Sequence, residues 1–478
     1  MVFEGLPGFG MYKHSVISED GSTYGLARGP EGKFLVVIGD GQGFDGETRD
    51  EALLCPLTAA NAAELRRRLD WLRPQPLGLV KSAGTGDRLG SATPGHIRAV
   101  RKAGDVAPIL AQQSMRENAR TQRTPQQVID DAMWGVFQEG WQEPWGADAD
   151  HLKTVADIDL CVAAGYTFYT VDPGDHVDNE AHTASLDVLT AKLDTLPWRV
   201  LADSPEGLRQ RYLGQRFEVE DLVFEFDETM AARAAAKYGR AIAHTAVMYR
   251  HLAAAMGSRT FELEVSVDET DTPTSPEEHF FVAHELRRLG VQWVSLAPRY
   301  IGRFEKGVDY IGDLDEFDRE MAKHAAIARA LGPYKLSIHS GSDKFSVYPI
   351  FYRHAGELVH LKTAGTSYLE ALRAVAQVDP DFFRQILGLA RVRYETDRAS
   401  YHVSAEIARV PRPQDMSDEQ LPHVLDLFDG REVLHVTFGS VLERMGDRLR
   451  ATLDANEEAH YAALEAHFDR HLAPFSKR

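Results

Sequence analysis

Residues 335–345 read KLSIHSGSDKF, and this stretch carries a pattern that the chain repeats. Its side chains alternate as far as the histidine, which places Lys335, Ser337 and His339 on one face of an expected strand. A small flexible turn follows and carries Asp343 and Lys344. A buried strand that ends on an imidazole, with charges just beyond it, is typical of the end of a parallel sheet at which active sites lie.

Seven other segments have the pattern of strands. A helical pattern closely follows each strand except the one expected at 166–175, which is the fourth along the chain. These strands are expected at 77–84, 107–114, 144–150, 166–175, 260–269, 291–299 and 357–366. Strands that alternate with helices pair in parallel. Eight such units predict a (β/α)₈ barrel of the TIM type, because the alternative, an open doubly wound sheet, usually has fewer units.

The remaining segments predict the domain organisation. Residues 1–74 contain a strand candidate at 33–41 and a helix at 58–72, which indicates a small α+β element. The catalytic barrel is expected over 75–390, with a helical insertion at about 175–258 after the fourth strand. Residues 391–478 form a C-terminal extension with a strand candidate at 432–439 and an amphipathic terminal helix. We expect this extension to cap the barrel or to mediate homo-oligomerisation.

Composition excludes several classes of protein. With 72 acidic against 53 basic residues the net charge is -19, so a nucleic-acid backbone would be repelled. The two cysteines, Cys55 and Cys161, have no metal-site spacing and suit a reducing compartment. The first residues lack a signal-peptide pattern, and no apolar run is long enough to span a bilayer. We therefore expect a cytoplasmic protein with a small-molecule partner.

A glycine-rich stretch after the first strand candidate imitates a dinucleotide site. Gly41, Gly43 and Gly46 match the G-x-G-x-x-G spacing. The following residues do not open a convincing helix, and no βαβ unit follows. The stretch is interpreted as a flexible hairpin loop.

Polar side chains fall at or near the ends of all eight expected strands. Besides His339, they are Lys81, Asp87 and Arg88; Gln113; Asp148, Asp150, His151 and Lys153; Asp172, Asp175 and His176; Glu262, Glu264, Ser266 and Asp268; Arg299; and Lys362. Each has a structural alternative: Asp150 could cap a helix, and Glu262 and Glu264 could pair with Lys335 or Lys362 inside the barrel.

The number of carboxylates favours a metal, because several buried carboxylates without cations are costly. Nitrogen and oxygen ligands without a thiolate suit Zn, Mn, Ni or Co in an open site. The preferred ligands are Asp172, Glu264 and His339, with His151 and His176 as substitutes. Sequence spacing alone does not choose among them.

Seven blocks of the sequence resemble the bacterial tagaturonate epimerase family. They are GDRLGSATPGHIRA (86–99), GADADHLKT (146–154), DPGDHV (172–177), KLSIHSGSDKFSVYP (335–349), HLKTAGTSYLEALR (360–373), YHVSAE (401–406) and LHVTFGS (434–440). The resemblance implies a metal-dependent isomerase of hexuronate catabolism that interconverts D-tagaturonate and D-fructuronate at C4. A neutral ketohexose such as tagatose is the alternative substrate.

The chemistry of C4 inversion can be argued independently. The C4 hydrogen is not alpha to the C2 ketone, so its removal gives no stabilised carbanion. We expect retro-aldol cleavage of C3–C4 and re-addition to the other face of the aldehyde, with a metal as Lewis acid for the enediolate.

Roles follow from that chemistry as hypotheses. Asp148 and Lys153 are candidate bases, and Lys362 is a further catalytic candidate. The expected substrate-binding residues are Lys81, Asp87, Gln113, Arg299 and Lys344. An aldolase, a ketose–aldose isomerase and a noncatalytic sugar-acid sensor are competing functions.

Overall fold

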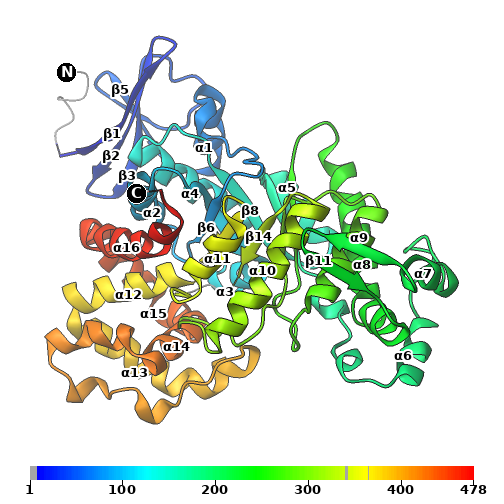
Figure 1. Ribbon diagram of the computed structural model, residues 1–478. Coiled ribbons are helices and arrows are strands. Elements are labelled where there is room, and N and C mark those ends of the chain that lie inside the picture. The colour runs from blue at the N-terminus through cyan, green and yellow to red at the C-terminus, as the bar shows by residue number, and fades with distance from the viewer. Residues whose placement is uncertain (1–7, 340–342, 364, 478) are drawn as a thin grey trace.

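The computed structural model describes residues 8–477 except 340–342 and 364, and a closed barrel lies at its centre (Figure 1). Eight parallel strands close in the order β12-β13-β14-β15-β6-β7-β8-β9. Their bounds are β6 (Ser82–Gly86), β7 (Ala107–Ser114), β8 (Gly146–Leu152), β9 (Phe168–Val171), β12 (Glu262–Ser266), β13 (Ser295–Ala297), β14 (Lys335–Ile338) and β15 (Val359–Lys362). The predicted (β/α)₈ fold is confirmed, and each strand overlaps its expected segment.

Helices surround the barrel. They are α2 (Thr93–Ala103), α3 (Met115–Thr121), α4 (Pro125–Glu139), α5 (Val155–Ala164), α9 (Pro276–Arg288), α10 (Leu314–Leu331), α11 (Tyr348–Ala355) and α12 (Thr366–Val378). Local chemistry sets several of their starts. Thr124, Thr154 and Ser275 each accept a hydrogen bond from the backbone N–H three residues later, in a capping box that satisfies otherwise unpaired donors.

The insertion between β9 and β12 supplies the helix that the fourth strand lacked in the sequence pattern. It contains α6 (Leu186–Leu193), α7 (Pro205–Tyr212), the hairpin β10 (Arg216–Val219) and β11 (Leu222–Glu225), and α8 (Glu228–Met256). The long helix α8 packs against both α5 and α9. It therefore occupies the position of the fourth barrel helix, and the excursion before it is the true insertion.

The N-terminal element is larger than the sequence indicated. Five antiparallel strands occur in the order β1-β2-β3-β5-β4, where one was expected. They are β1 (Gly10–Glu19), β2 (Ser22–Gly29), β3 (Gly32–Ile38), β4 (Glu47–Arg49) and β5 (Ala52–Pro56), followed by α1 (Ala59–Arg68). Most side chains of β1 and all of β4 are outside the core, so these strands lack an apolar signal. The glycine-rich stretch links β3 to β4.

The strand expected at 432–439 is wrong, because this segment is helical. It spans the end of α14 (Phe428–Val436) and the start of α15 (Phe438–Ala455). Residues 430–436 are all buried, the polar Arg431, Glu432 and His435 included, so this stretch has no exposed polar face, and periodicity does not distinguish it from a strand. With α13 (Pro380–Asp397), α14 and α15 form a second core against α12.

The terminal helix α16 (Glu457–Leu472) packs beside α2 and α12 (Figure 1). Short 3₁₀ turns complete the chain at η1 (Asp70–Leu72), η2 (Gly174–His176), η3 (Asn179–His182), η4 (Arg398–Ser400), η5 (Ile407–Arg409), η6 (Pro413–Asp415), η7 (Asp418–Asp426) and η8 (Ala473–Phe475). In the described part of the chain, no helix has an apolar stretch that would reach across a bilayer. The flexible turn expected at 340–342 lies outside the described residues.

Candidate active site

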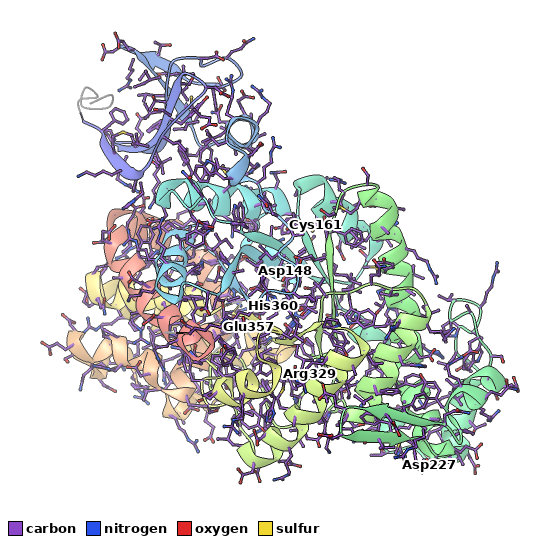
Figure 2. All side chains as sticks on the ribbon, turned by 45° about the horizontal axis from the view of Figure 1, so that its top comes forward. Asp148, Cys161, Asp227, Arg329, Glu357 and His360 are labelled. Atoms are coloured by element: carbon purple, nitrogen blue, oxygen red, sulfur yellow. The ribbon has the colours of Figure 1, made fainter. Side chains whose placement is uncertain are left out.

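Lys362, at the end of β15, occupies the centre of the site. Its Nζ atom lies 2.7 Å from Asp148 Oδ2, 2.8 Å from Asp150 Oδ1 and 2.8 Å from Glu264 Oε1. Asp148 lies among the barrel strands in the middle of the molecule (Figure 2). These side chains come from β8, β12 and β15 and are almost fully buried. A single ammonium group therefore faces three carboxylates.

His339 follows β14 and contacts the same group. Its Nε2 atom lies 2.6 Å from Glu264 Oε1. On its other edge, Nδ1 lies 3.3 Å from Asp268 Oδ1 and 3.2 Å from Ser266 Oγ. The period-two alternation of β12 directs Glu264 and Ser266 to this interior face.

His151 lies on β8 in a left-handed backbone conformation, with φ +50°. Such a conformation is uncommon for a residue other than glycine and is concentrated at functional sites. The imidazole Nδ1 lies 3.5 Å from Asp172 Oδ2, and the ring centroid is 5.3 Å from that of His339. Asp150, His151 and His339 offer ligand atoms that all lie within 4.8 Å of one another. A metal ion could be held at this point.

The electrostatics of the group reflect its burial. Burial raises the pKa of Asp148 to about 7, against the opposing charge of Lys362. Burial alone would lower the pKa of both histidines. The charge of Asp150 and a hydrogen bond with Asp172 instead raise the pKa of His151 to about 10, and Asp268 and Glu264 raise that of His339 to about 9. The neighbouring carboxylates thus stabilise the protonated, positively charged form of both imidazoles.

A cleft opens above this group, and its walls come from barrel loops and the C-terminal extension. Its border includes Arg88, Gln112, Arg116, Glu117, Asp150, His151, Glu269, Lys306, His339, Lys362, Tyr401 and His435. An adjoining cleft shares Arg116, Glu269, Lys306, His339 and Tyr401 and extends to Arg299 and Arg303. Arginine and lysine side chains therefore surround the open part of the site.

The structure brings together eight of the residues singled out in the sequence: Asp148, Asp150, His151, Glu264, Ser266, Asp268, His339 and Lys362. Asp172 lies one step away, behind His151. Lys153 is half-buried and pairs with Asp175 at 2.9 Å and Asp172 at 3.7 Å. Asp150 is not a helix cap, because Thr154 caps α5.

Lys81 is the clearest error of placement. The first strand begins at Ser82, after this residue, so Lys81 lies at the opposite end of the strand from the site. Its Nζ atom contacts Asp105 Oδ2 at 2.8 Å and the Phe475 carbonyl at 2.6 Å. A role in binding substrate does not agree with this position.

Asp87 and Gln113 are also occupied elsewhere. Asp87 accepts hydrogen bonds from the backbone N–H groups of Leu89, Gly90 and Ala92, and so shapes the loop before α2. Gln113 donates to Thr121, whereas its neighbour Gln112 borders the cleft and donates to Asp150. The sequence pattern indicated Gln113 in place of Gln112, one residue away. The reason is that the pairing of β7 with β8 shifts in register between Ile109 and Ala111.

Lys344 and His176 lie apart from the cleft. Lys344 is buried and donates to the carbonyl groups of Glu305 and Val308, and burial lowers its pKa to about 7. His176 stacks on His244, with ring centroids 4.1 Å apart. Neither position supports the substrate-binding or metal-binding role expected for it.

Several cleft residues were not singled out: Gln112, Arg116, Glu269, Lys306, Tyr401 and His435. Some signals existed, because Tyr401 and His435 belong to blocks that carried the family resemblance, and Glu269 ends the fifth strand segment. Arg116 and Lys306 lie in regions where strand periodicity does not apply.

Comparisons with known proteins agree over almost the whole chain. The family model described as tagaturonate epimerase matches residues 12–475. The tagaturonate/fructuronate epimerase of Thermotoga maritima is 45% identical over 474 residues, covering 97% of this chain and 96% of the relative. The native crystal structure of the fructuronate-tagaturonate epimerase from Cohnella laeviribosi has a TM-score of 0.93 and 39% identity, over 98% of this chain and 97% of that one. The same enzyme in complex with one glycerol gives the same TM-score and identity. This chain belongs to the tagaturonate epimerase family.

Proposed function

We propose that this protein interconverts D-fructuronate and D-tagaturonate by inverting C4. The observation that carries the proposal is the buried group around Lys362, at the carboxyl end of the barrel, in a member of this family. The similar proteins from Thermotoga maritima and Cohnella laeviribosi bear the name of this activity.

Retro-aldol chemistry suits the arrangement. Removal of the C4 hydroxyl proton turns C4 into an aldehyde as the C3–C4 bond breaks, and the electron pair moves into an enediolate on C2 and C3. The aldehyde half rotates, C3 attacks its other face, and the proton returns to the C4 oxygen. No hydrogen on C4 is exchanged in this sequence.

The residues fit a divalent metal ion. Among the described residues, Glu264 Oε2 is buried without a hydrogen-bond partner, and the donors are the nitrogen and oxygen atoms that Zn, Mn, Ni or Co accept. We assign Asp150, His151 and His339 as ligands, with Glu264 as the fourth. Asp172 is better placed to orient His151 than to bind the ion. When bound, the metal supplies Lewis acidity for the oxygen that becomes negative.

Lys362 and Asp148 are proposed to move the proton. Lys362 borders the cleft, and Asp148 lies behind it. In a concerted transfer, Lys362 passes a proton to Asp148 as it takes the C4 hydroxyl proton, and the reverse follows re-addition. Lys362 keeps its ammonium charge throughout, in agreement with its raised pKa. Burial alone would lower the pKa of Lys362, but the charges of Asp148, Asp150 and Glu264 raise it. General acid–base steps of this kind contribute about 10²–10⁴-fold.

The cations of the cleft favour an anionic substrate over a neutral ketohexose. Arg116 and Lys306 both face Glu269, at 3.0 Å and 3.5 Å, and Arg299 borders the adjoining cleft. A substrate carboxylate could replace Glu269 as the partner of Arg116, whose planar guanidinium binds carboxylates in a bidentate manner.

The test is incubation of metal-stripped protein with D-fructuronate in ²H₂O, with and without added Mn, Zn, Ni or Co, followed by NMR. Metal-dependent formation of tagaturonate without deuterium at C4 is expected. Deuterium at C4 would contradict the retro-aldol route. Conversion of D-tagatose but not of the uronate would contradict the substrate assignment.

Lys153 is tested separately, because it was a candidate base and lies outside the cleft border. Replacement of Lys153 by Met with kcat retained would remove it from the mechanism. A loss as large as that of a Lys362 variant would show that the proton path runs past Asp172.

A further inference from the structure

A second group of metal-binding side chains lies outside the cleft, where α16 meets the barrel. Asp343 follows β14, and His467 and His471 stand one turn apart on α16, so their side chains share a face of the helix. All three are buried, with 6%, 4% and 0% of their surface exposed. None of them borders the cleft as it is described above.

The three ligand atoms point at one another. Asp343 Oδ1 lies 2.9 Å from His467 Nε2 and 3.1 Å from His471 Nε2, and the two nitrogen atoms are 3.1 Å apart. Thr366 Oγ1, at the start of α12, lies 2.6 Å from His467 Nε2 and 3.4 Å from Asp343 Oδ1. Two imidazoles, a carboxylate and a hydroxyl therefore converge from three separate segments.

The second ring nitrogen of each histidine already has a partner. His467 Nδ1 lies 3.3 Å from Glu370 Oε1, and His471 Nδ1 lies 3.0 Å from the Tyr348 hydroxyl. Metal-bound histidines are usually oriented by such a partner on the second ring nitrogen, often a carboxylate. With a proton on each Nδ1, both Nε2 lone pairs would be directed at Asp343 Oδ1.

This arrangement is costly without a cation. Three lone-pair-bearing atoms within about 3 Å of one another repel unless a proton or a metal lies between them. Arg431 Nη2 lies 2.5 Å from Oδ2, the other oxygen of Asp343, and fixes that carboxylate.

We propose that Asp343, His467 and His471 bind a second divalent ion of the zinc type, which links α16 to Asp343. Three nitrogen and oxygen ligands with a hydroxyl nearby suit a four-coordinate ion such as Zn²⁺ or Co²⁺. The ion would be structural, because the site lies away from the cleft and its ligands come from segments far apart in the chain. Ion binding there adds directly to the stability of the folded state.

Cobalt binding by the full-length protein tests the proposal. Metal-stripped wild type is titrated with Co²⁺, and bound cobalt is measured by elemental analysis and by visible absorption. Wild type should bind about two ions per chain, and the H151Q/H339Q variant about one, with the intense spectrum of a four-coordinate site. H467Q/H471Q should lose that ion and its spectrum. Absence of bound cobalt from folded H151Q/H339Q would overturn the proposal.

The matched control is H460Q, which changes a third buried histidine of α16 that is not part of the group. It should bind as much cobalt as wild type. Thermal unfolding gives a second readout that does not need a variant of Asp343, His467 or His471: a chelator should lower the Tm of H151Q/H339Q. An unchanged Tm would count against a structural ion even if H467Q/H471Q failed to fold.

The proposal is independent of the proposed epimerase activity. H467Q/H471Q that is folded and supplied with metal should retain its cleft ion. Lack of epimerisation by wild type with both ions bound would refute the function and leave the second site standing.

Discussion

Lys362 partly compensates the negative charge of the carboxylates in the site. Its ammonium lies within 2.8 Å of oxygen atoms of Asp148, Asp150 and Glu264, all in the barrel interior. Three buried carboxylates are tolerated because this cation and the imidazoles face them. The same residue is therefore expected to serve both stability and chemistry.

Replacement of Lys362 by Met should lower kcat by at least about 10²-fold, because the proton path to Asp148 and a positive charge are lost together. The free energy of unfolding should fall by about 3–5 kcal/mol, as expected when a buried charge loses its partner. Steady-state kinetics and urea unfolding, both with metal present, measure the two effects.

The matched control is K335M. Lys335 is also buried inside the barrel, but it begins β14 and donates to Ser82 at 2.9 Å, away from the cleft. K335M should reduce stability while kcat stays within about threefold, since the catalytic end of the barrel is the carboxyl end of the strands. Equal losses of kcat in both variants would contradict the assignment of Lys362.

Single residues of the site could be predicted from the sequence where strand position determines them. His339 and Lys362 were found because they stand at the carboxyl ends of strands, which the barrel brings together, and Glu264 was found because strand alternation places it on the inner face of β12. Lys81 was misplaced because the strand begins at Ser82, five residues later than its apolar pattern suggests. Arg116 and His435 could not be found in this way, because they lie on helices, α3 and the distant α14.

At the scale of elements, the insertion is fastened to the barrel through Glu285 of α9. Arg211 and Tyr212, at the end of α7, donate to Glu285 Oε1 at 2.9 Å each, and Arg288 lies 2.7 Å from Oε2. Burial alone would raise the pKa of Glu285, but hydrogen bonds with His284 and Arg288 and the charge of Arg211 lower it to about 2. The ionised carboxylate therefore stabilises the fold.

The pH dependence of stability follows from this lowered pKa. The contribution of Glu285 is fully present above the unfolded pKa of 4.5 and is lost as the pH falls from there toward 2. The E285Q variant lacks it, so the free energy of unfolding of wild type minus that of E285Q should be about 2–3 kcal/mol at pH 7 and shrink below pH 4.5. Urea unfolding across that range measures the difference.

E206Q, at an exposed glutamate of α7, is the control and should change the free energy of unfolding by less than about 0.5 kcal/mol at pH 7. A difference between wild type and E285Q that stays constant down to pH 2 would show that Glu285 acts through packing and not through its charge.

Elements were predictable where the apolar pattern was long and regular, as in the eight barrel strands and the capped helices after them. The segment at 432–439 failed because complete burial removed the polar face that marks a helix. The sequence did not identify α8 as the fourth barrel helix for a different reason. The segments α6, α7 and the β10–β11 hairpin separate α8 from β9 along the chain. The sequence pattern does not show that α8 then packs between α5 and α9.

At the scale of the whole molecule, the two ends of the chain meet. The N-terminal sheet contacts the start of α16 through Glu457, which lies 2.9 Å from Arg28, accepts from the Tyr12 hydroxyl at 2.6 Å and pairs with Lys33. Separations of more than 400 residues along the chain made this contact inaccessible to sequence patterns. It joins the sheet to the helices that also carry the second proposed metal site.

Replacement of Glu457 by Gln should therefore loosen the sheet from the rest of the molecule. Lys33 would lose its charged partner in a position where burial already lowers the pKa of the lysine, so the free energy of unfolding should fall by about 2–3 kcal/mol. The neighbouring E458Q is the matched control, because Glu458 is 78% exposed and pairs with Arg98, and surface pairs contribute about 1 kcal/mol or less. Urea unfolding compares the stabilities, and limited proteolysis between residues 57 and 81 reports release of the sheet. Faster cleavage in E457Q alone is expected, and equal behaviour of the two variants would show that packing against α4, rather than this charged cluster, holds the sheet in place.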